Sequence, residues 1–209
     1  MEFPSYFKHV RPPTPESNVP TQISETRGLK TLARKIPSQR WEFTFNGFTY
    51  NGSCNSSYNE SIKFFGEFVS RAENGYGIFD YKPNDEFLIG ALNIKLEESI
   101  VAGDDYFLIS VSPKPDSADA IIGKLFKFST ETKAYMISNA TLFGSTADTA
   151  FYRITTNIGS RFDQNEDTTI ISGATMRIKL RVDGGVGRGV TSNLVRDKTV
   201  YQFKMIEVI

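Results

Sequence analysis

The sequence predicts a mainly β protein: a β-sandwich with one short helix, plus an inserted five-stranded β-barrel. Strand-like runs dominate the chain after residue 40, and only one segment carries the start and stop residues of a helix. The strands between residues 93 and 163 form a series of their own, enough for a small barrel. We therefore expect a discontinuous sandwich over residues 25–92 and 164–209, with the barrel at 93–163 between its halves.

The first residues are predicted to form an extended N-terminal arm over residues 1–24. Six of the nine prolines precede residue 40, at positions 4, 12, 13, 15, 20 and 37. Proline removes the backbone donor that sheets and helices need. The arm is expected to be disordered alone or to lie along a neighbouring chain, so deleting residues 1–20 should barely affect the stability of the monomer.

Regular elements follow the arm. Residues 27–36 are predicted to form a first strand. The next run, RWEFTFNGFTY, alternates with a period of two, typical of a half-buried strand. Its predicted inner face is Trp41, Phe43 and Phe45, and its predicted outer face is Glu42, Thr44 and Asn46.

One helix is predicted between residues 57 and 74. Ser57 and Glu60 have the spacing of a capping box, and Asn74-Gly75 provides a stop. An apolar stripe follows at helical spacing: Tyr58, Ile62, Phe65 and Val69. We expect this stripe to cover a sheet.

Most of the remaining chain is predicted to be strand. The stretch LFKFSTETKAYMIS indicates a hairpin, because two β-prone runs flank the polar residues 129–133. In TMRIKLRV, the apolar residues alternate with cations. The other predicted strands are residues 76–81, 86–96, 106–112, 149–156, 168–182 and 199–208.

Composition excludes several function classes. The 24 basic and 24 acidic residues cancel, so the whole chain has no charge that favours nucleic acid or membrane. Cys54 and His9 are single, which argues against a disulfide framework, a His/Cys zinc site and a histidine-based triad. No apolar run is long enough to span a membrane. We expect no enzyme, no catalytic residue, no metal and no cofactor.

Three motifs are weaker candidates for chemistry. The glycine-rich residues 184–189 do not open an amphipathic helix, so we interpret them as a loop between strands instead of a phosphate site. In the pairs Glu97-Glu98 and Asp104-Asp105, the two side chains are neighbours in sequence and would point in different directions on a strand. This favours a solvated surface over a pair of carboxylates for glycoside hydrolysis. The acidic run at 163–167 lacks the spacing of a calcium loop.

Two groups remain as candidate binding residues. The cations Arg27, Lys30, Arg34 and Lys35 crowd an early stretch, whereas acidic residues crowd positions 97–119. Either these are two unrelated solvated surfaces, or they meet between copies of the chain and steer assembly. Aromatic residues of the barrel, Tyr106, Tyr135 and Tyr152, are candidate glycan-binding residues, although core packing is the favoured reading.

The segment IGKLFKFSTETKAYMISNA, followed by FYRITT, resembles part of the distal tail proteins of long-tailed bacteriophages. The similarity is closest to members that carry an oligosaccharide/oligonucleotide-binding (OB) type barrel inserted in a β-sandwich. RWEFTF, the segment SYNESIKFFGEFVSRAENG, and the final strands MRIKLRV and TVYQFKMIEV occur in the same order. Together these stretches cover most of the chain beyond the arm, which is less plainly matched.

The resemblance implies a structural virion protein of the tail tip or baseplate, assembled in the host cytoplasm. A hexameric ring of copies would join the tail tube protein to the tail-tip hub protein and leave a lumen for DNA. Side fibres or host glycans are further candidate partners, whereas sequence-specific nucleic-acid binding is not expected. The alternative function is a carbohydrate-binding module that recognises host-surface glycans through the barrel.

Overall fold

The computed structural model describes residues 1–18, 21–25, 31–35, 39–51, 59–73, 77–90, 93–183, 190–195 and 197–209. The chain forms two compact units. Unit 1 consists of Met1–Tyr81 and Lys179–Val208, and unit 2 consists of Lys82–Ile178 with the terminal Ile209. Unit 2 is therefore inserted into unit 1, and the expected barrel at 93–163 lies inside it.

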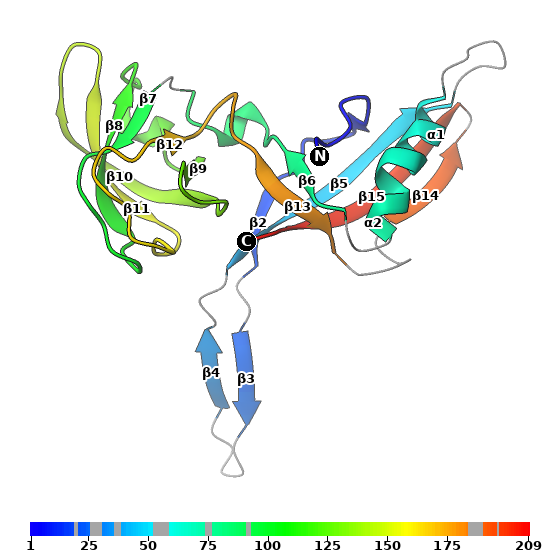
Figure 1. Ribbon diagram of the computed structural model, residues 1–209, viewed down its shortest axis with the longest axis horizontal. Helices are drawn as coiled ribbons and strands as arrows, with labels where there is room; N and C mark the ends of the chain where they lie inside the picture. Colours follow the sequence, from blue (N-terminus) through cyan, green and yellow to red (C-terminus); the bar gives the residue numbers. More distant parts are fainter. Residues whose placement is uncertain are drawn as a thin grey trace. The chain divides into compact units, whose positions relative to one another are not determined.

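Unit 1 is built on a seven-stranded sheet with the order β1-β5-β15-β13-β6, in which β2 also pairs with β5 and β14 with β15 (Figure 1). The strands are β1 (Lys8–His9), β2 (Pro15–Asn18), β5 (Arg40–Tyr50), β6 (Phe79–Tyr81), β13 (Ile178–Val182), β14 (Val190–Val195) and β15 (Lys198–Glu207). The two long strands pair in antiparallel register from Lys198↔Tyr50 to Ile206↔Glu42.

The alternation of β5 and β15 places their aromatic residues in one core. Phe43 and Phe45 are buried as predicted, and Phe45 stacks on Phe203 of β15 at 5.0 Å between ring centroids. Glu42 lies between these inward residues and was expected to face solvent. It is instead buried, because it pairs with Lys204 and accepts a hydrogen bond from Asn18.

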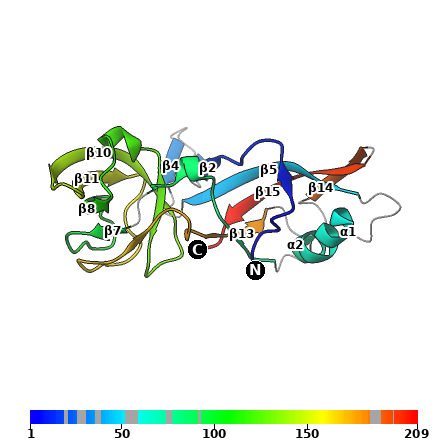
Figure 2. The ribbon, with the colours of Figure 1, turned by 90° about the horizontal axis from the view of Figure 1, so that it is seen from above.

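The helical segment covers one face of this sheet (Figure 2). It comprises α1 (Glu60–Phe64), a π-helical turn η1 (Phe65–Val69) and α2 (Ser70–Glu73). The N-cap is Asn59, whose side chain accepts the N–H groups of Ser61 and Ile62. The predicted cap Ser57 and the stripe residue Tyr58 lie outside the described residues.

The predicted apolar stripe of the helix is wrong at two positions. Ile62 and Phe65 are exposed, whereas Phe64, Phe68 and Ala72 are buried. The buried set is spaced four residues apart and continues through the π-helical turn. Its rings reach the sheet, since the Phe68 centroid lies 4.9 Å from that of Phe203.

The N-terminal residues are part of the core of unit 1, not a separate arm. Phe7 is only 3% exposed, and its ring stacks on Phe64 at 5.0 Å. The Phe3 ring lies 5.1 Å from Phe45 and 5.4 Å from Phe68. β1 and β2 pair with β5. The first 18 residues therefore belong to unit 1 instead of forming the separate arm expected over residues 1–24, because apolar rings near the prolines supply burial that the prolines do not prevent.

A second, two-stranded sheet joins β3 (Thr21–Glu25) to β4 (Thr31–Lys35). The strands are antiparallel, with register from Thr21↔Lys35 to Glu25↔Thr31. Among the described residues, neither strand pairs with the seven-stranded sheet. The hairpin therefore receives no ladder hydrogen bonds from the other described strands of unit 1.

Unit 2 contains a six-stranded sheet with the order β12-β9-β10-β11-β8-β7. Its strands are β7 (Asn93–Leu96), β8 (Tyr106–Ser112), β9 (Leu125–Phe128), β10 (Tyr135–Ser145), β11 (Ala150–Thr156) and β12 (Ile170–Ile171). An antiparallel bridge between Lys95 and Thr169 brings the two ends of the sheet together. The sheet is thus nearly closed into a barrel, with six strands instead of the expected five.

The core of unit 2 lies inside this barrel. Its members come from every strand, and Ile89 and Ile170 join them from outside the expected limits of 93 and 163. The predicted hairpin is confirmed, because β9 and β10 pair through Phe126↔Tyr135 and Leu125↔Met136. The predicted fold class is also confirmed: the protein is mainly β, with one helical segment, a sheet in each unit and a barrel in the second.

Candidate functional site

The outer face of β8, β10 and β11 in unit 2 carries an unusual group of exposed side chains. On β11, Tyr152 and Ile154 are buried in the core, so Arg153 between them faces outward. Arg153 pairs in register with Leu108 of β8 and Thr141 of β10. The guanidinium is therefore held at the middle of a three-stranded surface.

Two aromatic rings flank this guanidinium. The guanidinium carbon of Arg153 lies 5.4 Å from the Tyr106 centroid and 5.6 Å from the Phe143 centroid, within the range of cation–π attraction. Tyr106 begins β8, and Phe143 is the extra residue at a bulge where the β10–β11 register shifts between Leu142 and Gly144. We call Tyr106, Phe143 and Arg153 the aromatic patch.

Glu98 fixes the position of Arg153. Its Oε1 atom accepts a hydrogen bond from Arg153 Nη1 at 2.5 Å and another from the Leu108 N–H at 2.8 Å. The carboxylate is therefore anchored to β8 while it compensates the charge of the guanidinium. The result is a charge-balanced, donor-rich centre between two rings.

The patch borders a shallow hollow of about 410 Å³, which is lined by Tyr106, Thr141, Leu142, Phe143 and Arg153. Tyr106 is 60% exposed and Phe143 is 68% exposed. Their rings therefore offer apolar surface to solvent at a place where the backbone is held by three paired strands. Such a hollow is in the size range of small-ligand sites.

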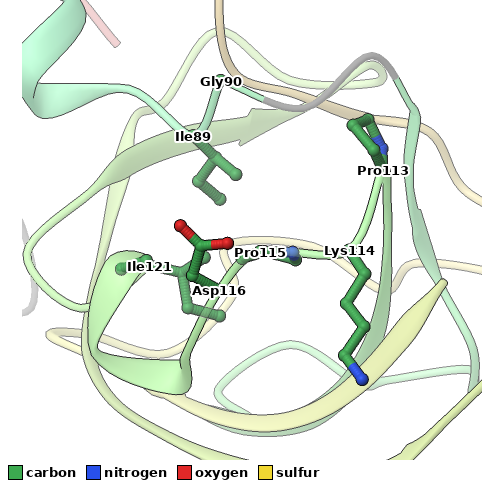
Figure 3. Close-up of a pocket in the computed structure, with 8 residues that line it drawn as sticks. Ile89, Gly90, Pro113, Lys114, Pro115, Asp116 and Ile121 are labelled. Carbon is green, nitrogen blue, oxygen red and sulfur yellow. The ribbon is translucent and has the colours of Figure 1, made fainter. Parts of the chain in front are cut away.

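A second hollow of about 270 Å³ lies elsewhere in unit 2 (Figure 3). Ile89 and Ile121 contribute apolar walls, and the Asp116 carboxylate points towards Ile89. Lys114 extends away from Asp116, and its Nζ donates a hydrogen bond to Ser145 Oγ at 3.2 Å. The hollow thus offers one carboxylate among apolar and proline surfaces, with the nearby lysine engaged elsewhere.

A buried polar network lies beside the β9–β10 hairpin. Glu131 accepts hydrogen bonds from the Tyr135 hydroxyl at 2.7 Å and from Gln164 Nε2 at 2.6 Å. Burial raises the pKa of Glu131, opposed by these two donors and by the nearby Arg161 charge. Thr130 Oγ1 donates to Gln164 Oε1 at 2.6 Å, which orients the amide. This network ties the hairpin turn to a distant segment and opens into neither hollow.

No protein-family model matches the chain, and no curated protein matches it.

The three tyrosines predicted as glycan-binding residues lie in different environments. Tyr135 and Tyr152 are each 1% exposed and belong to the barrel core, so neither presents a ring to a ligand. Only Tyr106 is on the surface. Sequence reasoning missed Phe143 and Arg153, although two features pointed to them: LFG breaks the alternation of β10, and the arginine of FYRITT falls between inward residues.

The predicted interface cations are only partly described. Arg34 and Lys35 lie in β4, opposite Gln22 and Thr21 of β3. Arg27 and Lys30 lie outside the described residues, as does the glycine-rich segment 184–189 that connects β13 to β14.

The candidate carboxylates have protein partners. Asp104 Oδ2 accepts the Val101 N–H at 3.0 Å, Asp163 Oδ1 accepts the Ala102 N–H at 2.8 Å, and Asp167 pairs with Lys95 at 3.5 Å. In the part of the chain that the structure describes, no group of three His, Cys, Asp or Glu side chains is arranged to hold a metal ion. Across the same residues, no helix has the length and apolar character needed to cross a membrane.

Proposed function

We propose that this chain is a structural subunit of a phage tail tip, in which a hexameric ring links the tail tube to the tail-tip hub. The observation that carries the proposal is the separate β3–β4 hairpin. Two strands of five residues form a sheet of their own, and their pairing extends to no other described strand. Such a hairpin is marginally stable in water, so contact with another chain would stabilise it.

The charge of the hairpin sequence supports contact between subunits. Arg34 and Lys35 end β4, and the neighbouring sequence adds Arg27 and Lys30 with Glu25 as the one opposing charge between residues 25 and 40. Six of the 24 acidic residues of the chain lie between positions 97 and 119. Opposite charges on different parts of one chain favour a head-to-tail contact between copies, in which each subunit gives one surface and receives the other.

A head-to-tail contact must close to avoid open-ended fibres. The resemblance to distal tail proteins supplies the expected sixfold closure and the partners on each side. A ring subunit requires rigid sheets and complementary edges but no nucleophile. The sheets of the two units of this chain are compatible with such a role.

Charge reversal on the hairpin tests the proposal. Replacing Arg34 and Lys35 by Glu should abolish the hexamer in native mass spectrometry, because the reversed charges repel the neighbouring acidic surface. Circular dichroism and the thermal midpoint should change little, since β3 and β4 form a sheet separate from the main ones. Lys179→Glu with Arg181→Glu, the same reversal on exposed positions of β13, serves as the matched control.

Purified virions provide the second measurement. Quantitative mass spectrometry should find about six copies of the chain per particle, the number in one closed ring. Hundreds of copies would indicate a tube or capsid protein and would overturn the proposal. Retention of the hexamer in the hairpin variant would remove the hairpin from the interface. Loss of the hexamer in the β13 variant would show that the effect of charge reversal is not specific to the hairpin.

A further inference from the structure

We propose that the aromatic patch of Tyr106, Phe143 and Arg153 binds a neutral saccharide. The patch lies on the outer face of the unit 2 barrel and borders a hollow of about 410 Å³. This inference goes beyond the proposed ring function and does not depend on it, because every residue involved belongs to one barrel of one chain.

The two rings provide the apolar part of the site. A pyranose ring has a face of C–H groups that is apolar, and burial of this face against an aromatic ring removes apolar surface from water. Tyr106 and Phe143 are more than half exposed, so the parts of their rings that do not contact Arg153 are available to such a sugar ring. Thr141 pairs with Arg153, and Phe143 follows two residues later, so alternation along the strand directs Phe143 to the same side of the sheet as Arg153.

Arg153 and Glu98 provide the polar part. Sugar hydroxyls both donate and accept hydrogen bonds, and this pair presents guanidinium donors beside a carboxylate acceptor. Arg153 Nη1 donates to Glu98 at 2.5 Å, and the arginine side chain also lines the hollow beside the two rings. The Tyr106 hydroxyl adds a group that can donate or accept.

The charge of the surroundings selects against anionic ligands. Glu98 neutralises Arg153, and Asp104 and Asp105 immediately precede Tyr106 in the chain. Among the described residues that line the hollow, Arg153 is the one cation and it is already paired with Glu98, so a phosphate, a sialic acid or a nucleic-acid backbone would gain little from it. A neutral saccharide meets no such penalty, so the electrostatics favour it over the nucleic acids that barrels of this size also bind.

Arg153, the central residue of the patch, is positioned before any ligand arrives, because Glu98 accepts its hydrogen bond. Arg153 lies on the middle strand of three, and the side chains on either side of it, Tyr152 and Ile154, are fixed in the core. Little side-chain freedom is therefore lost on binding at this position. A single site of this kind is shallow and should bind weakly.

The test is an array of immobilised neutral oligosaccharides of glucose, galactose, rhamnose and N-acetylhexosamines, probed with the full purified chain. Sialylated glycans, uronic acid polymers and single-stranded DNA are printed beside them. We expect binding to at least one neutral oligosaccharide. Phe143→Ala and Tyr106→Ala should each weaken that binding by about tenfold, whereas Tyr106→Phe, which keeps the ring, should retain most of it.

The matched control is Phe162→Ala. Phe162 is 55% exposed in the same unit, and Arg161 lies over its ring at 5.2 Å, so it reproduces the chemistry of the patch at another place. This variant should bind like the wild type. Thermal unfolding of each variant shows that the barrel remains folded, as expected for side chains that are mainly exposed.

Several outcomes would overturn the inference. The first is that the chain binds no neutral glycan, or binds only the charged glycans or DNA. The second is that Phe162→Ala weakens glycan binding as much as the patch variants do. The third is that the patch instead mediates self-association, which Phe143→Ala would then abolish. Because the array uses the isolated chain, a negative result leaves the ring proposal to its own test of copy number and hexamer formation.

Discussion

Glu131 illustrates how a residue can differ from its sequence context. The polar stretch at residues 129–133 correctly predicts the turn between β9 and β10, but Glu131 and Lys133 are buried instead of solvated. The carboxylate is satisfied by Tyr135, four residues away, and by Gln164, 33 residues away. The sequence around residues 129–133 does not indicate that Gln164 lies next to Glu131. The turn could therefore be predicted from the sequence, but the burial of its charged residues could not.

Replacement of Glu131 by Gln should change the pH dependence of stability. Burial raises the pKa of Glu131 in the folded protein, so its contribution to stability is present below its unfolded pKa and is lost as the pH rises through the folded value. Glutamine does not ionise, so its contribution to stability does not fall as the pH rises. The free energy of unfolding of Glu131→Gln relative to wild type should therefore increase from pH 4 to pH 7, by at most about 1.4 kcal/mol per pH unit.

Urea unfolding across this pH range measures that difference. Glu166→Gln, the same exchange at an exposed position of unit 2, serves as the control. The informative quantity is the change with pH of the difference in unfolding free energy between Glu131→Gln and wild type. Its value at a single pH is not informative, because glutamine also changes the hydrogen bonds that Tyr135 and Gln164 donate. A difference that stays constant, or that falls as the pH rises, would show that the folded pKa of Glu131 is not raised.

The elements of unit 1 show which patterns determine structure and which do not. Alternation correctly predicted the apolar inner face of β5, although Glu42 on its predicted outer face is buried as well. In β13, Ile178 and Leu180 are buried and the two cations that alternate with them are exposed. The helix offered two apolar stripes in the same turn, and the one at Phe64 and Phe68 is buried. The π-helical turn changes the spacing between successive residues, so an ideal helical period could not select between the stripes.

Phe7→Ala should destabilise unit 1 strongly. Phe7 is almost fully buried and its ring contacts Phe64, so truncation removes apolar burial and leaves a cavity, at a cost of about 3–5 kcal/mol. Phe65→Ala is the matched control, because Phe65 is 55% exposed on the helix. Chemical denaturation should show the loss for Phe7 and a change near zero for Phe65. Equal stability of the two variants would restore the view that the N-terminal residues are dispensable.

At the scale of the whole molecule, the sequence predicted an insertion but not its limits. The inserted unit runs from Lys82 to Ile178, beyond the predicted 93–163, because short pieces at both ends complete the barrel. Ile89 and Ile170 enter its core, and Thr169 bridges Lys95. These pieces are too short to form a periodic pattern. The aromatic patch was missed for the same kind of reason, since it requires three strands and a bulge to meet.

The last prediction follows from this division. Residues 82–178 expressed alone should fold, because their core cluster draws all its members from within that range and the sheet nearly closes on itself. Residues 1–81 alone should not fold. They lack β15, which pairs with β5 from Lys198↔Tyr50 to Ile206↔Glu42 and supplies the buried Tyr201, Phe203 and Met205.

Calorimetry should show a cooperative unfolding transition for fragment 82–178 and none for fragment 1–81. Adding the peptide 179–209 should restore structure to fragment 1–81. A fragment 82–178 that binds hydrophobic dyes and melts without a transition would mean that the barrel depends on unit 1 for its stability.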